Sequence, residues 1–138
     1  MKTTKKIAVL SFITLLSVSI FSCEKDKRTP PDLTLETGTG FVSTDTTFMV
    51  GTTLKVKAHA KKTEDELKTF NASYAYDGAT TTTTKDTYTI SSSSEKKDYT
   101  KEYTFVLRNT AGTEEWSFSI TDRDGNITTK KIKVTVTP

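Results

Sequence analysis

The 138-residue sequence has a single cysteine, Cys23, and a single histidine, His59. One of each is too few for an internal disulfide, for the cysteine and histidine clusters that bind structural zinc, or for most nucleophilic triads. By its alternation with neighbouring residues, His59 belongs on a solvent-exposed polar face. We therefore expect no cofactor, and we expect that the chain is not an enzyme.

The sequence also lacks a concentrated basic segment outside its first residues. It contains 20 lysines and arginines against 17 acidic residues. Three of the lysines, Lys2, Lys5 and Lys6, precede Cys23 in a stretch without acids, and the remainder is balanced at 17 of each sign. A nucleic-acid partner is therefore not expected, because binding to nucleic acid calls for an accumulated positive surface.

Residues 1–22 have the layout of a secretory signal, with the three lysines followed by an apolar stretch over residues 7–21. That stretch is too short and too rich in serine and threonine for a permanent membrane span, which needs about 20 apolar residues. It ends in Ile20-Phe21-Ser22-Cys23, which resembles the lipobox of bacterial lipoproteins. The resemblance implies cleavage before Cys23 and a covalent lipid on that cysteine. An ordinary secreted protein is the alternative.

The residues after the cysteine, Cys23-Glu24-Lys25-Asp26-Lys27, resemble the start of lipoproteins of the Bacteroidetes group. The resemblance implies a protein anchored by its lipid to the outer membrane and displayed on the outer cell face, with the periplasmic face as the alternative. Residues 23–31 are expected to form a charged linker, because they end in Pro30-Pro31, which continues neither a helix nor a central strand.

The rest of the chain, residues 32–138, alternates apolar and polar residues, which predicts β-strands with one buried face. The strong segments are residues 54–60, 70–76, 103–107, 116–120 and 132–136, and the weaker ones are residues 33–35, 48–50 and 88–90. Only residues 63–68 show a helical pattern, and a loop fits them equally. Seven or eight short strands predict an all-β fold, an antiparallel two-sheet sandwich, with a small closed barrel as the alternative.

Residues 115–136 resemble the closing hairpin of bacterial immunoglobulin-like and PKD-like domains, with an aromatic strand, a Thr-Asp-Arg-Asp-Gly-Asn turn and a strand rich in threonine and valine. Residues 51–56 resemble the second strand of these domains, with its leading Gly-Thr. The segment Tyr74-Ala75-Tyr76-Asp77-Gly78 resembles the PKD motif more loosely. The resemblance implies an immunoglobulin-like sandwich, an architecture that hosts many functions.

Few residues are candidates for chemistry. Asp122, Asp124 and Asn126 place three oxygen ligands in one short segment, which makes Ca²⁺ binding conceivable. A tight hairpin turn, in which these side chains cap their own backbone, is the favoured interpretation, so we expect no metal site. Thr46 lies in Asp45-Thr46-Thr47, which resembles the O-glycosylation motif of exported Bacteroidetes proteins.

Aromatic side chains are the candidates for ligand contact, because exposed rings stack on sugars and pack against proteins. We expect Trp116 in the core. The tyrosines that could contact a ligand are Tyr74, Tyr76, Tyr88 and Tyr99, of which Tyr99 is expected to be exposed in a polar loop. The favoured function is a lipid-anchored, non-catalytic binding or adhesion module that takes a glycan or a surface protein as its partner. A structural or accessory subunit without a ligand of its own is the alternative.

Overall fold

The computed structural model describes residues 28–138. The expected signal over residues 1–22 and the lipid-bearing Cys23 lie outside these residues. Within the described part, the chain forms eight β-strands, and it contains no helix long and apolar enough to cross a membrane. Of residues 63–68, where the sequence left a short helix open, residues 63–66 lie in a loop between two strands and residues 67–68 begin the second of these strands.

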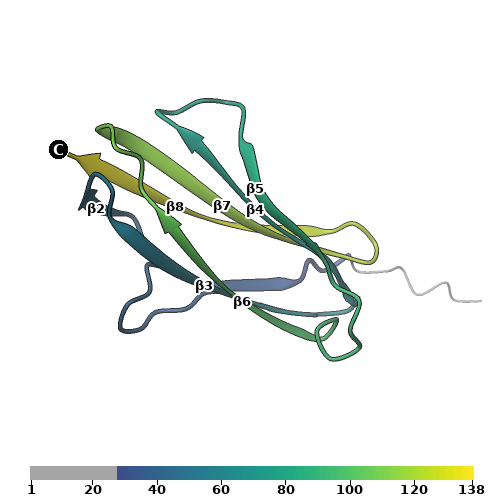
Figure 1. Ribbon diagram of the computed structural model, residues 1–138. Helices are drawn as coiled ribbons and strands as arrows, with labels where there is room; N and C mark the ends of the chain where they lie inside the picture. Colours follow the sequence, from purple (N-terminus) through teal and green to yellow (C-terminus); the bar gives the residue numbers. More distant parts are fainter. Residues whose placement is uncertain (1–27) are drawn as a thin grey trace, which may run out of the picture.

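Two sheets pack face to face in an immunoglobulin-like sandwich, which confirms the predicted fold class (Figure 1). The three-stranded sheet has the order β1-β3-β6 and the five-stranded sheet has the order β2-β8-β7-β4-β5. The strands are β1 (Asp32–Leu35), β2 (Thr46–Met49), β3 (Thr53–Lys61), β4 (Leu67–Tyr76), β5 (Thr83–Thr89), β6 (Asp98–Val106), β7 (Gly112–Asp122) and β8 (Ile127–Thr137).

One strand pair departs from the antiparallel pattern. β1 pairs with β3 in one sheet, and the chain then crosses over so that β2 pairs in parallel with β8 of the other sheet. The alternation of apolar and polar residues does not predict this strand pairing, because the pairing depends on how the connection over residues 36–45 crosses between the sheets. β1 and β6 are therefore the edge strands of the three-stranded sheet, and β2 and β5 are the edge strands of the five-stranded sheet.

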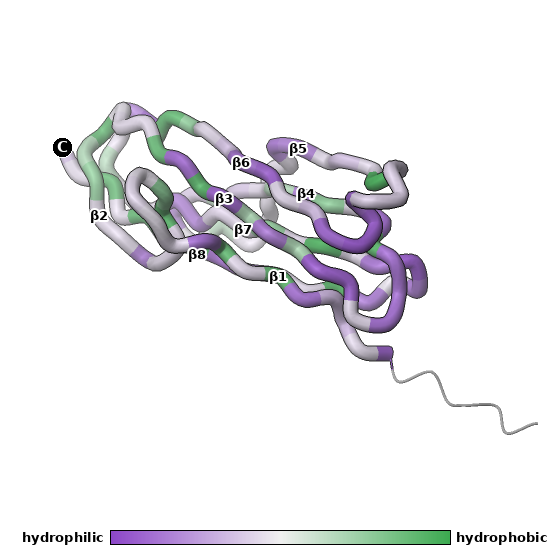
Figure 2. Tube along the Cα trace, turned by 90° about the horizontal axis from the view of Figure 1, so that it is seen from below, coloured by the Kyte–Doolittle hydropathy of each residue, from purple (hydrophilic) through white to green (hydrophobic). Residues whose placement is uncertain are grey.

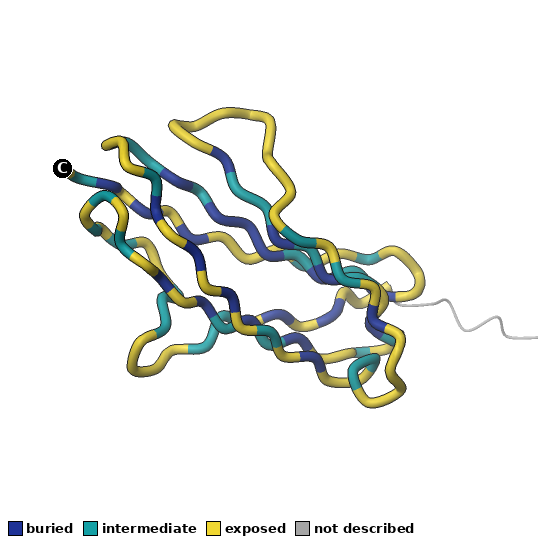
Figure 3. Tube along the Cα trace, in the orientation of Figure 1, coloured by how far each residue is buried: buried dark blue, intermediate teal, exposed yellow. Residues whose placement is uncertain are grey.

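The core lies between the sheets, where buried and exposed residues alternate along the strands (Figure 3). In β3 the buried residues are Leu54, Val56, Ala58 and Ala60, as the alternation predicts. Trp116 is 4% exposed, which confirms its place in the core. His59 lies on the outer face of β3, where its Nε2 is 2.9 Å from an Asp98 carboxylate oxygen.

The expectation that Tyr99 is exposed in a loop is wrong. Tyr99 is 3% exposed, because β6 begins at Asp98, several residues earlier than predicted, and so carries Tyr99 into the core. Its ring packs against Phe70 at a centroid distance of 5.5 Å and stacks on Tyr88 at 5.4 Å. This burial excludes Tyr99 as an exposed ligand contact, and it also raises the pKa of the Tyr99 hydroxyl to about 12.

The two ends of the sandwich differ in which segments they carry. We call the end formed by residues 28–31 and the turns 62–66, 90–97 and 123–126 the N-terminal pole. Here the Thr63 hydroxyl donates a hydrogen bond to the Thr29 carbonyl, and Pro31, placed in the linker by its sequence, is buried. The opposite end, the C-terminal pole, carries the last residue and the turns 49–53, 76–82 and 106–111 (Figure 1).

Candidate functional site

Two of the tyrosines singled out from the sequence, Tyr74 and Tyr76, lie together at the C-terminal pole. They belong to an aromatic row that runs outward from the core. The Trp116 ring stacks on Phe105 at 3.9 Å and meets Tyr74 at 5.0 Å, and the Tyr74 ring meets Tyr76 at 5.1 Å. Tyr76 is 40% exposed, so the row ends in a ring that is held by its neighbours and open to solvent.

An arginine completes this row. The Arg108 guanidinium carbon lies 4.8 Å from the centre of the Tyr76 ring, a distance at which cation and ring attract each other. Its Nη1 donates a 2.7 Å hydrogen bond to one Asp77 carboxylate oxygen, and Nη2 donates to the other. This two-pronged geometry holds a planar guanidinium in one orientation. Asp77 also accepts a hydrogen bond of 2.8 Å from the Thr113 backbone N–H.

The buried side chain of Glu114 supports the cluster through two hydrogen bonds. Glu114 is 1% exposed and accepts two hydrogen bonds, from the Arg108 backbone N–H at 2.8 Å and from Trp116 Nε1 at 3.0 Å. It therefore joins the 106–111 turn to the aromatic row. Arg108 is held by its hydrogen bonds with Glu114 and Asp77, and Tyr76 by its ring contacts with Tyr74 and Arg108.

The ion pair between Arg108 and Asp77 changes the pKa of Asp77. The Arg108 guanidinium and, to a smaller extent, the Thr113 N–H lower the pKa of Asp77 to about 2. Because the folded pKa lies below that of the unfolded chain, the pair stabilises the fold above about pH 4, and this contribution is lost as the pH falls toward 2. In the Arg108→Gln variant we expect the pKa of Asp77 to rise toward 4, measured by carbon-detected NMR of its carboxyl group. An unchanged pKa in the variant would show that the guanidinium does not hold Asp77 ionised.

Other exposed apolar residues lie at the same pole, at the ends of β2 and β6. The exposed large apolar residues of the described chain include Met49 (63%), Val106 (63%) and Tyr76, all at the C-terminal pole, whereas Ile127 lies at the opposite pole. Figure 2 shows the same asymmetry, with apolar segments near the C-terminus and hydrophilic turns at the other end. The turns interlock, since the Thr52 carbonyl accepts a hydrogen bond from the Leu107 N–H and the Arg108 carbonyl accepts one from the Gly51 N–H.

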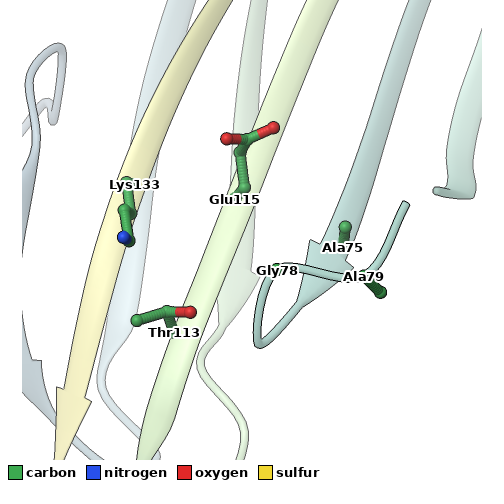
Figure 4. Close-up of a pocket in the computed structure, with 6 residues that line it drawn as sticks. All are labelled: Ala75, Gly78, Ala79, Thr113, Glu115 and Lys133. Atoms are coloured by element: carbon green, nitrogen blue, oxygen red, sulfur yellow. The ribbon is translucent and has the colours of Figure 1, made fainter. Parts of the chain in front are cut away.

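A shallow cavity of about 160 Å³ lies nearby on the outer face of the five-stranded sheet. In Figure 4, Glu115 and Lys133 on the neighbouring strands β7 and β8 flank it on one side, and Ala75 with the 78–79 turn flanks it on the other. Lys133 also lines a second cavity of about 310 Å³. That cavity includes Thr46, the residue singled out for glycosylation, which stands at the start of β2.

The acidic turn near Asp122 forms a hairpin cap. Asp122 is buried, and its Oδ1 accepts hydrogen bonds from the backbone N–H groups of Asp124 and Asn126, while its Oδ2 accepts one from the Asn126 amide. The hydrogen bonds of the Asp122 carboxylate therefore stabilise the turn itself. Within residues 28–138, no group of three or more His, Cys, Asp or Glu side chains is arranged so that it could hold a metal ion.

The residues that organise the C-terminal pole could not be predicted from the sequence. The sequence Asp77-Gly78 predicts a turn. It does not predict the ion pair with Arg108, because the two residues are 31 positions apart. Glu114 sits at an inward-facing position of a strand, and a charge at such a position is the only local signal that it is buried and hydrogen-bonded.

Comparison with known proteins adds information on the fold. The sequence matches no protein-family model and no curated protein. Among solved structures, a superoxide reductase (neelaredoxin) from Ignicoccus hospitalis is similar with a TM-score of 0.54 at 7% identity, over 79% of this chain and 81% of that one. A chitin binding domain from Burkholderia pseudomallei is similar with a TM-score of 0.50 at 10% identity, over 69% of this chain and 58% of that one.

The first of these structures corrects one expectation. The sequence led us to expect that the chain is not an enzyme, but a superoxide reductase has the same sandwich architecture, which contradicts that expectation. The identity is so low that the likeness shows the fold alone, and it assigns no reaction to this chain.

Proposed function

We propose that this protein is a lipid-anchored protein of the bacterial outer membrane whose immunoglobulin-like sandwich binds a partner outside the cell. The observation that carries the proposal is the Tyr76–Arg108–Asp77 cluster, which is partly exposed, held together by an ion pair and a cation–ring contact, and placed at the pole opposite residue 28. A lipid on Cys23 leaves only residues 24–27 between the anchor and the described domain. The N-terminal pole then stands nearest the membrane and the C-terminal pole faces away from it.

A sandwich of similar fold serves as a binding domain elsewhere, in the chitin binding domain from Burkholderia pseudomallei. That likeness supports a binding role for the architecture without naming the ligand. A protein or a glycan beyond the membrane is the partner class that the proposal covers.

The anchor and its orientation are tested together in cells that express the full chain. We expect the wild-type protein in the membrane fraction and its domain digested when protease is added to intact cells. Cys23→Ala is expected to abolish membrane retention, because each buried methylene of an acyl chain contributes about 0.8 kcal/mol of membrane affinity. Ser22→Ala, which keeps a small residue before the cysteine, is the matched control and is expected to remain anchored.

Two results would contradict the proposal. Retention of Cys23→Ala in the membrane fraction would mean that the cysteine carries no anchor. Protection of the wild-type domain until the outer membrane is opened would place it on the periplasmic side, where an accessory subunit of an envelope complex is the better description.

A further inference from the structure

We propose that the outer face of the five-stranded sheet carries a second binding site, and that its ligand is an acidic glycan. Small side chains on the neighbouring strands β4 and β7 form the centre of this site. They alternate with core residues and therefore face outward. We call them the polar floor: Asn71, Ser73, Ala75, Ser117 and Ser119. The site is separate from the Tyr76–Arg108–Asp77 cluster, and it does not depend on the lipid anchor.

The polar floor is recessed in its sheet. Ser117 is 9% exposed and Ala75 is 7% exposed, although both face away from the core. The outward residues of the flanking strands β5 and β8 are exposed along most of their length. On the other sheet, no outward residue of β1, β3 or β6 is buried. The floor therefore lies below its flanks, and the cavity of about 160 Å³ that Ala75 lines is at one end of it.

Two polar groups of the floor have no hydrogen-bond partner. Asn71 Oδ1 is buried and accepts no hydrogen bond. The Ser117 hydroxyl, on a buried residue, forms none with any side chain or backbone group of residues 28–138. The two residues lie on adjacent strands, where Asn71 pairs with Ser119 and Ser117 pairs with Ser73. Because buried polar groups in proteins are ordinarily hydrogen-bonded, these two indicate a ligand that brings donors and acceptors of its own.

The chemistry of the floor favours a glycan over a polypeptide. Polypeptides bind to sheets along a free edge or through side chains that fill apolar pockets. β4 and β7 are paired on both sides, so neither offers a free edge, and the apolar part of the floor is the single methyl group of Ala75. Serine hydroxyls and an asparagine amide both donate and accept hydrogen bonds, as the closely spaced hydroxyls of a sugar do.

The charges beside the floor favour an acidic glycan. Lys133 and Glu115 flank the cavity at the end of the floor (Figure 4). The Glu115 carboxylate accepts a 2.7 Å hydrogen bond from Lys131 Nζ, which compensates its charge. The Lys133 ammonium forms no ion pair within residues 28–138. It is therefore available to a carboxylate of the ligand, and such charge-assisted hydrogen bonds are stronger than neutral ones.

Binding of the purified full-length chain in detergent to immobilised polysaccharides tests the assignment. The probes are polygalacturonate, alginate and hyaluronate, each beside its carboxyl-reduced form, which keeps the same sugar backbone without the charge. We expect the chain to bind at least one of the acidic glycans. Its affinity for the carboxyl-reduced form of that glycan should be about tenfold lower, because the charge-assisted hydrogen bond to Lys133 is lost.

Substitutions then locate the site. Lys133→Gln is expected to weaken binding of the acidic glycan about tenfold and to leave the carboxyl-reduced form unaffected. Ser117→Tyr is expected to abolish binding of both forms, because the ring covers the polar floor. The matched controls are Lys55→Gln and Thr104→Tyr, which replace a cross-strand pair on the outer face of the other sheet and should leave binding unchanged. Urea denaturation checks that both tyrosine variants are folded.

The assignment is overturned by the absence of binding to every acidic probe, by equal binding of the acidic and reduced forms, or by wild-type binding of folded Ser117→Tyr. Tyr76→Ala separates this site from the cluster at the C-terminal pole and is expected to bind like wild type. Loss of glycan binding in that variant would place the ligand at the cluster instead. Glycan binding by the purified chain is measured without cells, so failure of Cys23 to retain the protein in membranes refutes only the anchor.

Discussion

Replacing Phe70 with alanine is expected to lower the free energy of unfolding by about 4 kcal/mol, the largest effect of any single change considered for this domain. Phe70 is fully buried in β4, the strand between β5 and β7. Its ring packs across the sandwich against Tyr99 at 5.5 Å and stacks on Tyr103 at 5.8 Å, so it joins the two sheets. Truncation removes these contacts and leaves a cavity that the rigid sheets cannot close.

Urea denaturation followed by Trp116 fluorescence measures this loss, and the melting temperature should fall by roughly 15 °C or more for a domain of this size. Phe41→Ala is the control, because Phe41 lies half-buried in the 36–45 connection, where the Lys57 ammonium sits 6.0 Å from its ring centre. Its effect should be less than half as large. Equal effects of the two substitutions would mean that the centre of the core does not lie between Phe70 and β6.

The second large effect is expected at Glu114, a buried charge that two donors satisfy. Glu114→Ala removes the acceptor for the Arg108 N–H and for Trp116 Nε1, and the indole N–H is then left buried without a partner. An unsatisfied buried donor costs about 1 to 3 kcal/mol, so we expect the variant to lose about 3 kcal/mol of unfolding free energy. The 106–111 turn should also loosen, which hydrogen exchange of its amides reports.

Glu115→Ala is the matched control for this change. The Glu115 side chain is 42% exposed and pairs with Lys131 at 2.7 Å on the outer face, and an exposed ion pair contributes about 0 to 1 kcal/mol. A loss at Glu114 no larger than at Glu115 would contradict the role assigned to the buried carboxylate. It would also remove the support on which the positions of Arg108 and Tyr76 depend.

The fold could be predicted from the sequence to a large extent because alternation is a local property of the chain. Leu54, Val56, Ala58 and Ala60 alternate with polar residues, and their strand follows from those neighbours alone. The start of β6 could not be found in this way. Its first residues, Asp98-Tyr99-Thr100-Lys101, contain only one large apolar side chain, so they read as a polar loop. They are strand because each pairs in register with a residue of β3.

The candidate site was predictable only in part. Tyr74 and Tyr76 stand out as aromatic residues near a turn, and the structure places them together at the C-terminal pole. Tyr99 stands out in the same way but is buried, because its exposure depends on Phe70 and Tyr88 from other strands. The Asp122 turn differs, because its carboxylate accepts hydrogen bonds from Asp124 and Asn126, which lie within four positions in the sequence.

The sequence by itself determined that the fold is built from seven or eight strands, the inward faces of the strongly alternating ones, and the turns at Asp77-Gly78 and Asp124-Gly125, because these depend on residues within a few positions of each other. Only the tertiary structure decided that Arg108 meets Asp77, that Glu114 is buried beneath them, and that the charge-poor turns gather at one pole. Asp77 and Arg108 are 31 positions apart, and the turns at this pole come from different parts of the chain. These contacts form only because of the order and register of the strands, and a local pattern of residues does not predict either of these.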